Sequence, residues 1–370
     1  LLVMINTLYI NMKLSQFDYK LPKELIAEKP IRWTDRDEGR LMVLHRETGA
    51  IEHKQMKDLK DYLQKDDLMV FNNTRIFPSL LKGEKEKTGA EVVVFLVREL
   101  NAETFLWDVV VEPARKIRIG NKLYFGDDAS LVAEVVDNTT SRGRTIRFLF
   151  DDSHEAFMKK IHSMGTPSRP HEESLDDVME IRRVTKEDDK KDHNPLFAKI
   201  EGSCITPAAG LHFSREMLTR LEIQDVRFAQ ITLHAGMGNF KPIEVEDLSK
   251  HRMDSEELMV DEPTCDLINL TKQNGRKVCA VGTTVMKALE SAVTIPGKVS
   301  PYTGWSNKFI FPPYNFTIAD MMLTNFHEPK TSMMILVSSF AGTDNLMTAY
   351  QIAIKEKYKF SLYGDAMLIV

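Results

Sequence analysis

The strongest constraint on the fold is a change in secondary-structure pattern near residue 78. From Pro78 to Asp151, apolar runs such as AEVVVFLV, TFLWDVVV and TIRFLF alternate with the turn-like KTGA, NAE and NTTSRG, and no helical period is present. Evenly spaced strands with Gly, Asn and Asp between them are typical of a small antiparallel barrel or sandwich. We therefore predict an inserted antiparallel β-barrel domain over residues 78–159.

The later part of the chain alternates strands with helices. RKVCAVG precedes TTVMKALESAV, and ADMMLTNF precedes TSMMILVSSFAG, so that a buried strand is followed each time by a helical segment. This alternation indicates a layered α/β domain with a mainly parallel sheet. We predict that residues 12–77 and 160–370 form this discontinuous domain, and that residues 1–11 are a non-native or mis-called extension, because a cleaner pattern begins at Met12.

Charge and cysteine usage narrow the class of protein. A net charge of −5 over 370 residues argues against a surface coated in basic residues, although a local basic face remains open. Cys204, Cys265 and Cys279 are odd in number and lie in apolar surroundings, which predicts core thiols in a reducing, cytoplasmic compartment. No apolar run approaches the roughly 18 residues of a membrane span. The charged stretch 171–194 is expected to be a solvated surface loop.

Two segments place polar residues where a strand should meet a helix. Ligands of open α/β sheets bind at the carboxyl ends of strands, where loops and helix N-termini converge. Thr283 and Thr284 follow the strand KVCAV, and either could cap the next helix or face a ligand. In TPAAGLHF, Thr206 and His212 precede a helix that Ser214 could cap. An ordinary capped helix and a structural histidine remain the alternatives.

Two further strand ends carry histidines. ITLHAGMGNFKP places His234 before Gly236 and Gly238, but it matches G-x-G-x-x-G only in part and is a weak phosphate signal. LTNFHEPK places Asn325 and His327 together, before a helix that Thr331 could cap.

Other signals are weaker or argue against whole classes of enzyme. Glu256 lies in a polar cluster that could equally be a solvated helix face. The chain has neither G-x-S-x-G nor the Walker motif, which weakens hydrolase and nucleoside-triphosphatase functions. The histidine spacings match no zinc motif, so we expect no metal site. The residues alone indicate an enzyme with an imidazole-rich pocket and leave its substrate open.

A set of ordered motifs identifies a family that this chain resembles. PAAGLHF, TLHAGMGNFKP, AVGTTVMKALES, TGWSNKFIFPPYNF and LTNFHEPKTSMMILVSSFAG, preceded by VFNNTRIFPSLLKG, are similar to motifs of the S-adenosylmethionine:tRNA ribosyltransferase-isomerases of queuosine biosynthesis. The resemblance runs from about Met12 to the C-terminus. It implies an α/β domain with an inserted β-barrel.

The resemblance also implies a reaction. The ribosyl part of S-adenosylmethionine would move onto 7-aminomethyl-7-deazaguanine at the tRNA wobble position and isomerise to epoxyqueuosine, with release of adenine and methionine. S-adenosylmethionine would be a co-substrate, with no permanently bound cofactor, and tRNA carrying the precursor would be the partner. We expect a monomer that does not enter a membrane.

The implied chemistry gives roles to the residues already singled out. A base must remove a proton beside the sulfonium and an acid must assist the departure of adenine, which imidazoles with a pKa near neutrality could do. His212, His234 and His327 are the predicted catalytic residues. Trp305 or Tyr314 could stabilise the sulfonium through an aromatic face, with Glu256 or Asp365 as alternatives. The remaining predicted ligand contacts are Thr206, Gly236, Gly238, Thr283, Thr284 and Asn325.

Local basic runs are candidates for contact with tRNA. Lysines and arginines could grip phosphates in a salt-dependent way, or form a solvated face of the barrel. The predicted tRNA contacts are Arg75, Lys82, Arg115, Lys116 and Lys287, with Lys85, Lys87, Arg118 and Lys122 in the same runs.

Several positions depart from the family pattern. Lys241 and Lys287 stand where arginine is usual, which keeps the charge but loses the bidentate geometry of arginine. Asn239 replaces a threonine, Asp254 a histidine and Pro313 a glycine, and His193-Asn194-Pro195 replaces a Tyr-Gln-Thr-Val run. These departures leave two alternatives open, a non-catalytic RNA-binding protein and another S-adenosylmethionine enzyme such as a methyltransferase.

Overall fold

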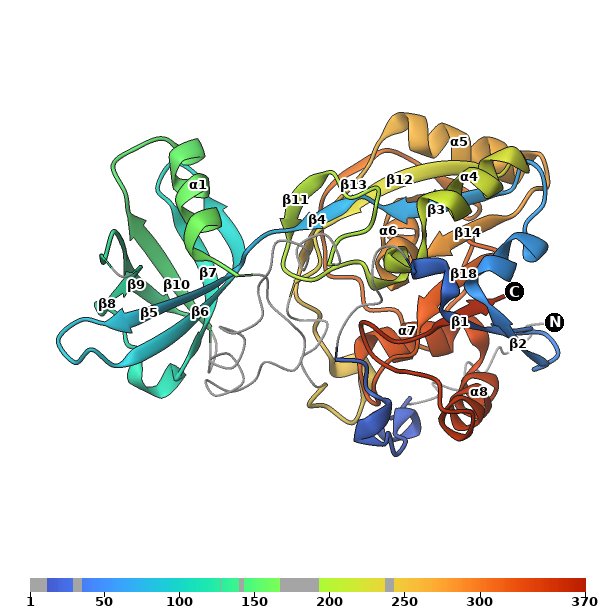
Figure 1. The fold of residues 1–370 in the computed structure, drawn as a ribbon, viewed down its shortest axis with the longest axis horizontal. Helices are drawn as coiled ribbons and strands as arrows, with labels where there is room; N and C mark the ends of the chain where they lie inside the picture. The colour runs from blue at the N-terminus through green and yellow to red at the C-terminus, as the bar shows by residue number, and fades with distance from the viewer. Residues whose placement is uncertain (1–11, 29–34, 127, 140–142, 167–192, 237–242) are drawn as a thin grey trace, which may run out of the picture. The chain divides into compact units, whose positions relative to one another are not determined.

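A computed structural model describes residues 12–28, 35–126, 128–139, 143–166, 193–236 and 243–370 (Figure 1). The predictions made for residues 1–11, for most of the charged stretch 171–194, and for Gly238, Asn239 and Lys241 lie outside these residues.

Contacts divide the chain into two compact units. The sheet unit comprises Leu1–Asn72, Ala208–Leu233 and Gly238–Val370, and the barrel unit comprises Asn73–Pro207 and His234–Met237. The barrel unit is wider than the insertion of 78–159 that the sequence predicts, because β4 (Thr74–Ile76) and β11 (Ile200–Ser203) pair with each other inside it.

A nine-stranded sheet forms the centre of the sheet unit. Strands β12, β3, β14 and β18 are parallel neighbours, and β19 and β1 are parallel to each other, while the other neighbouring pairs are antiparallel. The predicted layered α/β domain with a mainly parallel sheet is confirmed. In sheet order the strands are β17 (Tyr302–Ser306), β13 (Glu256–Val260), β12 (Arg227–Leu233), β3 (Leu68–Asn72), β14 (Val278–Val281), β18 (Met321–Asn325), β19 (Ala366–Ile369), β1 (Arg40–Leu44) and β2 (Ile51–Gln55).

The residues of each strand explain whether the strand lies in the centre of the sheet or at its edge. The strands LMVFN, VCAV and MMLTN are buried along their whole length, as strands of a parallel sheet covered on both faces must be. The edge strand β2 reads IEHKQ and is largely exposed, so its charged side chains discourage pairing with another chain.

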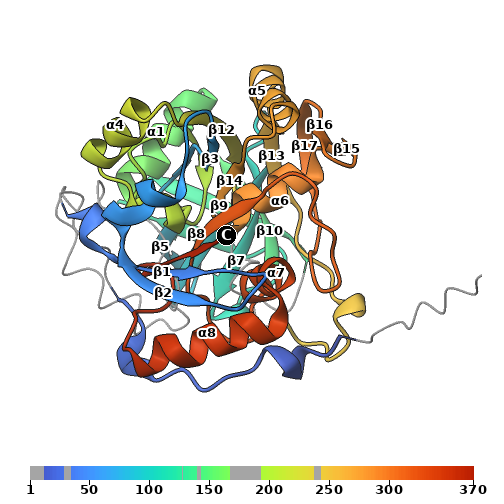
Figure 2. The same ribbon diagram turned by 90° about the vertical axis from the view of Figure 1, so that its right-hand side faces the viewer.

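Helices α5, α6 and α8 of the sheet unit contact this sheet. Helix α6 contacts β12, β13, β3 and β14, while α8 contacts β1, and Figure 2 shows α8 beside β1 and β2, at the opposite end of the sheet from α5. The bounds are α4 (Arg215–Ile223), α5 (Glu262–Gln273), α6 (Thr283–Ser291), α7 (Ser332–Ala341) and α8 (Thr343–Lys355). Shorter elements of this unit are the 3-10 helices Leu14–Phe17, Lys23–Leu25, Arg36–Glu38, Met56–Tyr62, Ala208–His212 and Leu248–Lys250, and a hairpin of β15 (Val293–Ile295) and β16 (Lys298–Val299).

Helix starts follow the capping expectations with one exception. The hydroxyls of Ser214 and Thr331 accept the amides of Met217 and Met334 at 3.0 and 3.3 Å, so both predicted caps are confirmed. The predicted cap of α6 by a threonine is wrong. Gly282 occupies that position and no side chain caps the helix, because both threonines already lie inside its first turn.

The barrel unit is built around a closed antiparallel barrel, which confirms the predicted insertion of a β-barrel. Its strand order is β10-β7-β6-β5-β8-β9, and buried and half-buried residues alternate strictly along β7. The bounds are β5 (Leu80–Lys85), β6 (Glu91–Asn101), β7 (Leu106–Glu112), β8 (Lys122–Phe125), β9 (Leu131–Asn138) and β10 (Gly143–Leu149), followed by α1 (His154–Met164). A 3-10 helix, Ala114–Lys116, follows β7.

Candidate functional site

The carboxyl ends of the parallel strands of the sheet unit meet at one edge, and Asn72 joins three of the segments found there. Its amide nitrogen donates to the carbonyl of Leu233 at 2.9 Å and to the Thr284 hydroxyl at 3.2 Å, and its amide oxygen accepts the Leu233 amide at 3.1 Å. Asn72 was not singled out in the sequence. The signal was the polar residue that ends the buried run LMVFN, inside the motif VFNNTR.

Asn325, at the end of β18, fixes the protonation of a predicted catalytic histidine. Its amide nitrogen faces the carbonyls of Ser361, Leu362 and Gly364 at 3.1–3.4 Å. The amide oxygen therefore points at Nε2 of His212, 3.3 Å away. Because that oxygen can only accept, His212 donates from Nε2 and its neutral ring carries the lone pair on Nδ1.

His327 is held at the same sheet edge. Its Nε2 lies 2.8 Å from the Thr324 hydroxyl, and its backbone amide donates to the Tyr350 hydroxyl at 3.0 Å. The Tyr19 hydroxyl donates to its carbonyl. With the side chain only 8% exposed, these contacts leave the imidazole little freedom to move.

Burial keeps both imidazoles neutral. Desolvation lowers the pKa of His212 to about 4, against the bond from Asn325, and the positive charge of Arg36 acts in the same direction as burial. Desolvation likewise lowers the pKa of His327 to about 4, opposed by Glu328. The expectation of a pKa near neutrality is therefore wrong for these two histidines, because the sequence does not show how deeply they are buried.

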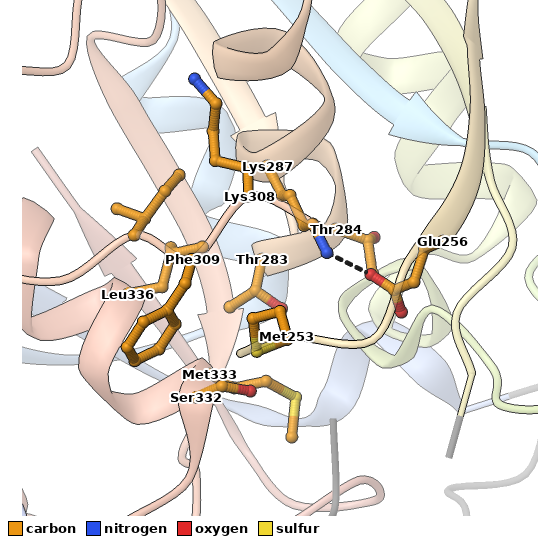
Figure 3. Close-up of a pocket in the computed structure, with 11 residues that line it drawn as sticks. Met253, Glu256, Thr283, Thr284, Lys287, Lys308, Phe309, Ser332, Met333 and Leu336 are labelled. Atoms are coloured by element: carbon orange, nitrogen blue, oxygen red, sulfur yellow. Dashed lines mark hydrogen bonds and ion pairs between the residues drawn. The ribbon is translucent and has the colours of Figure 1, made fainter. Parts of the chain in front are cut away.

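A pocket in the sheet unit brings four predicted ligand or tRNA contacts together. Thr283, Thr284, Glu256 and Lys287 line it, and the Lys287 ammonium lies 2.7 Å from the Glu256 carboxylate (Figure 3). The other lining residues are Met253, Lys308, Phe309, Ile310, Ser332, Met333 and Leu336. Of these, Ser332 was not singled out in the sequence, although it directly follows the predicted cap Thr331.

The first turn of α6 opens onto this pocket without a cap. Gly282 has φ +100°, in the left-handed region that favours glycine, and it turns the chain from β14 directly into the helix. The N-terminal end of a helix carries a partial positive charge and amides without intrahelical partners. This end of the pocket is therefore suited to an anion.

Besides Asn325, three described residues of the sheet unit that were predicted as ligand contacts do not line the pocket. Trp305 is 46% exposed on the edge strand β17. The Tyr314 hydroxyl donates to Glu290 at 3.0 Å, and burial raises the pKa of Tyr314. Asp365 accepts the amides of Lys359 and Arg40 at 2.8 and 3.3 Å, and burial raises its pKa. The contacts of Tyr314 and Asp365 hold neighbouring segments in place.

His234 belongs to the barrel unit. Its Nδ1 lies 2.7 Å from the Thr74 hydroxyl, and the ring is half-buried. A Cβ added at Gly202 would meet three atoms of this ring at 2.8–2.9 Å. The glycine therefore lets the imidazole lie directly against the backbone of β11. Thr206, in the same unit, has a buried hydroxyl with no hydrogen-bond partner among the described residues.

We expect Gly202→Ala to displace the His234 ring and, if the predicted catalytic role of His234 holds, to lower turnover about ten-fold or more, since small errors in the position of a catalytic group are costly. Steady-state kinetics of the reaction that the resemblance implies measure this effect. Ile200→Ala, on the same strand but exposed, is the control and should keep wild-type rates. Unchanged turnover in Gly202→Ala would show that the position of His234 does not matter for the reaction.

The predicted basic residues of the barrel unit lie in different settings. Arg115 and Lys116 are exposed, and the segment that carries them is fixed by the buried Arg144, whose guanidinium donates to the carbonyls of Ala114 and Ile117 at 2.6 and 3.0 Å. Arg75 pairs with Glu201 at 2.6 Å. Lys82 is half-buried.

Lys287, which was predicted to contact tRNA, is 5% exposed and lies in the sheet unit. Its ion pair with Glu256 and its burial do not favour a contact with the tRNA backbone.

The structure also bears on the predictions about metal ions, cysteines and membrane-spanning segments. Among the described residues, no three His, Cys, Asp or Glu side chains gather where they could hold a metal ion. Cys204, Cys265 and Cys279 are buried and form no disulfide. In the described part of the chain no helix has the length and apolar character needed to cross a bilayer.

Apart from Lys287, the described residues at which the chain departs from the family pattern do not line the pocket of the sheet unit. Asn194 accepts the amide of Ile76 at 3.0 Å, His193 is buried, and Asp254 is exposed just before β13.

The fold and the pocket define a class: an α/β protein with an inserted β-barrel and a pocket at the carboxyl ends of its parallel strands. The chain belongs to the family described as queuosine biosynthesis protein, whose model matches residues 14–369. The resemblance indicated by the motifs is thereby confirmed.

Named relatives match over nearly the full length. A protein of Flavobacterium psychrophilum named S-adenosylmethionine:tRNA ribosyltransferase-isomerase is 56% identical, covering 97% of this chain and 100% of the relative. A protein of the same name from Parabacteroides distasonis is 55% identical over the same shares of the two chains. The crystal structure of S-adenosylmethionine tRNA ribosyltransferase from Thermotoga maritima is 30% identical, with a TM-score of 0.53 over 96% of this chain and 100% of that one.

Proposed function

We propose that this protein is an S-adenosylmethionine:tRNA ribosyltransferase-isomerase. The observation that carries the proposal is the 56% identity over 359 residues with a relative of that name, spanning all of the relative. The sheet unit adds a pocket suited to a small charged ligand and two neutral imidazoles at the carboxyl ends of its strands.

The proposed reaction uses S-adenosylmethionine as a co-substrate and tRNA carrying 7-aminomethyl-7-deazaguanine as the acceptor. The ribosyl part is transferred to the aminomethyl group and isomerises, so that epoxyqueuosine forms and adenine and methionine are released. No permanently bound cofactor takes part, and the enzyme acts in the cytoplasm, where its three buried thiols stay reduced.

The protonation states of the histidines decide which of them fits the proposed base and which fits the proposed acid. A neutral imidazole can accept the proton beside the sulfonium, whereas an imidazolium cannot. His212 presents its lone pair on Nδ1, and burial keeps both His212 and His327 neutral near pH 7. Either of them therefore fits the base, and neither fits the acid that assists the departure of adenine. The catalytic role of His234 stays a prediction.

The exposed basic segment of the barrel unit supports the proposed contact with tRNA. Arg115 and Lys116 extend from a segment that Arg144 holds rigid, and Arg118 follows them at the surface. Phosphate contacts of this kind release counter-ions, so binding of tRNA should weaken steeply with salt.

One experiment tests the proposed function. The protein is incubated with S-adenosylmethionine and tRNA bearing the deazaguanine precursor, and the small products and the modified nucleoside are identified by mass. We expect adenine, methionine and a ribosyl-derived mass gain on the nucleoside, with none of them when the tRNA carries guanine instead.

The other outcomes separate the alternatives. S-adenosylhomocysteine would indicate a methyltransferase, and tight binding without any product would indicate an RNA-binding protein. Adenine without a mass gain on the tRNA would exclude ribosyl transfer.

A further inference from the structure

The pocket of the sheet unit contains a polar group that the fold does not use. Ser332, the first residue of α7, is 8% exposed, and its hydroxyl has no hydrogen-bond partner in the described part of the chain. A buried hydroxyl without a partner costs stability, so its presence in a pocket lining calls for a ligand that accepts or donates there.

The same pocket receives the uncapped N-terminus of α6. Thr283 and Thr284 form the first turn of this helix and line the pocket together with Ser332 (Figure 3). An uncapped helix start attracts negative charge, and the Ser332 hydroxyl can donate to it. Two independent features therefore favour a carboxylate or another small anion at this end.

The pocket also contains a negatively charged side chain. Glu256 is 5% exposed and is paired with Lys287, so the lining carries a buried carboxylate as well as positive groups. A simple anion such as phosphate would gain at the helix start but has no positive group to place beside Glu256. A ligand that carries both charges, an α-amino acid, can place its carboxylate at the helix start and its ammonium beside Glu256.

The rest of the lining suits the aliphatic part of an amino-acid side chain. Met253, Phe309, Met333 and Leu336 contribute apolar surface. Lys308 adds little charge there, because its ammonium donates to the carbonyl of Glu290 at 2.6 Å, and Figure 3 shows it directed away from Thr283 and Ser332. Methionine sulfur and phenylalanine faces pack well against a flexible sulfur-containing side chain.

We propose that this pocket binds the amino-acid end of S-adenosylmethionine, an inference that rests on the proposed function. The α-carboxylate lies at the first turn of α6, where it accepts from the Ser332 hydroxyl, and the α-ammonium lies beside Glu256. The methionine product leaves from the same pocket, so free methionine competes with S-adenosylmethionine.

The test compares ligands that share or lack the amino-acid part. Binding of S-adenosylmethionine and of 5′-methylthioadenosine, which lacks the amino acid, is measured by titration calorimetry on the full-length protein. We expect Ser332→Ala to weaken binding of S-adenosylmethionine about ten-fold, the effect of losing one hydrogen bond to a charged group, and to leave binding of 5′-methylthioadenosine unchanged.

Two further variants serve as a control and as a second test of the same end of the pocket. Ser339→Ala removes a hydroxyl of the same helix that bonds to the Ile335 carbonyl, so both ligands should bind it as they bind the wild type. Thr283→Val removes one of the two threonine hydroxyls in the first turn of α6 and should show the same ligand selectivity as Ser332→Ala. Since the Ser332 hydroxyl has no partner among the residues that the structure describes, its removal should not lower thermal stability.

The outcomes distinguish this inference from the proposed function. Equal weakening of both ligands, or of neither, would overturn the assignment of the pocket while adenine release still supported the function. Competition by inorganic phosphate but not by methionine would overturn it in favour of a phosphate site. If the wild type bound no S-adenosylmethionine and also released no adenine in the presence of the precursor tRNA, the proposed function itself would fail.

Discussion

Replacing Glu256 by alanine is expected to destabilise the sheet unit by about 3–5 kcal/mol, because it leaves the buried Lys287 ammonium without its counter-ion. The two side chains are 5% and 7% exposed, and the charged atoms lie 2.7 Å apart. A buried pair of this kind contributes little net stability while intact, but removing one partner exposes the full cost of burying the other. Urea denaturation followed by the helical circular dichroism signal measures the change, since α4–α8 all belong to the sheet unit.

Two controls separate charge burial from the loss of a side chain. Glu216→Ala breaks an ion pair with Arg220 on the exposed face of α4 and should cost no more than about 1 kcal/mol. The double variant Glu256→Leu/Lys287→Met replaces the pair by apolar groups of similar size and should recover most of the lost stability. A Glu256→Ala variant as stable as Glu216→Ala would show that Lys287 reaches solvent and that the pair is not buried in solution.

The architecture could be predicted from the sequence because two periodicities mark it clearly. Short strands separated by turn residues predict the barrel, and buried apolar runs followed by helices predict the parallel centre of the sheet. Since the carboxyl ends of parallel strands meet at one edge, the same reasoning indicates that polar residues after β14 and β18 belong to one edge. The hydrogen bond between Asn72, at the end of β3, and Thr284, after β14, agrees with that expectation, as does the contact of Asn325, at the end of β18, with His212.

The burial of individual charged groups could not be predicted. Lys287 looks like a surface lysine in TTVMKALES, but α6 is buried on nearly all sides, so that its lysine and Glu290 are enclosed together with its apolar residues. Glu256 lies 31 residues away in the chain, on β13, and only the tertiary fold brings it to Lys287. The low pKa values of His212 and His327 have the same origin, since desolvation depends on packing that no local pattern reports.

The sequence also could not predict the direction in which individual side chains point. The chemistry of Trp305 and Asp365 makes both of them candidate ligand contacts. In the structure, however, β17 lies at the edge of the sheet and exposes the Trp305 side chain. The carboxylate of Asp365 already accepts hydrogen bonds from two backbone amides. Ser332, in contrast, could not be recognised from the sequence as a candidate ligand contact. A serine at the start of a helix is common, and only the lack of a partner for its buried hydroxyl distinguishes it.

Lowering the pH from about 7.5 to about 5.5 is expected to reduce the free energy of unfolding of the sheet unit by roughly 3 kcal/mol through His212 and His327. Burial lowers the folded-state pKa of each to about 4, below the usual unfolded value near 6.5. The unfolded state therefore binds protons first. The stabilising contribution is fully present above about pH 6.5 and is lost progressively as the pH falls towards 4, at about 1.4 kcal/mol per pH unit for each histidine.

Two variants isolate this effect from the other titrating groups of the sheet unit. His212→Gln keeps an amide donor for Asn325 but cannot titrate, so the loss of stability between the two pH values should shrink by about 1.4 kcal/mol. Ser214→Ala removes the cap of α4 and should cost about 1 kcal/mol equally at both pH values. If His212→Gln lost stability with pH as steeply as the wild type, the pKa of His212 would not differ between the folded and unfolded states. Burial would then not be what keeps this imidazole neutral, and the pH dependence would have to come from other groups.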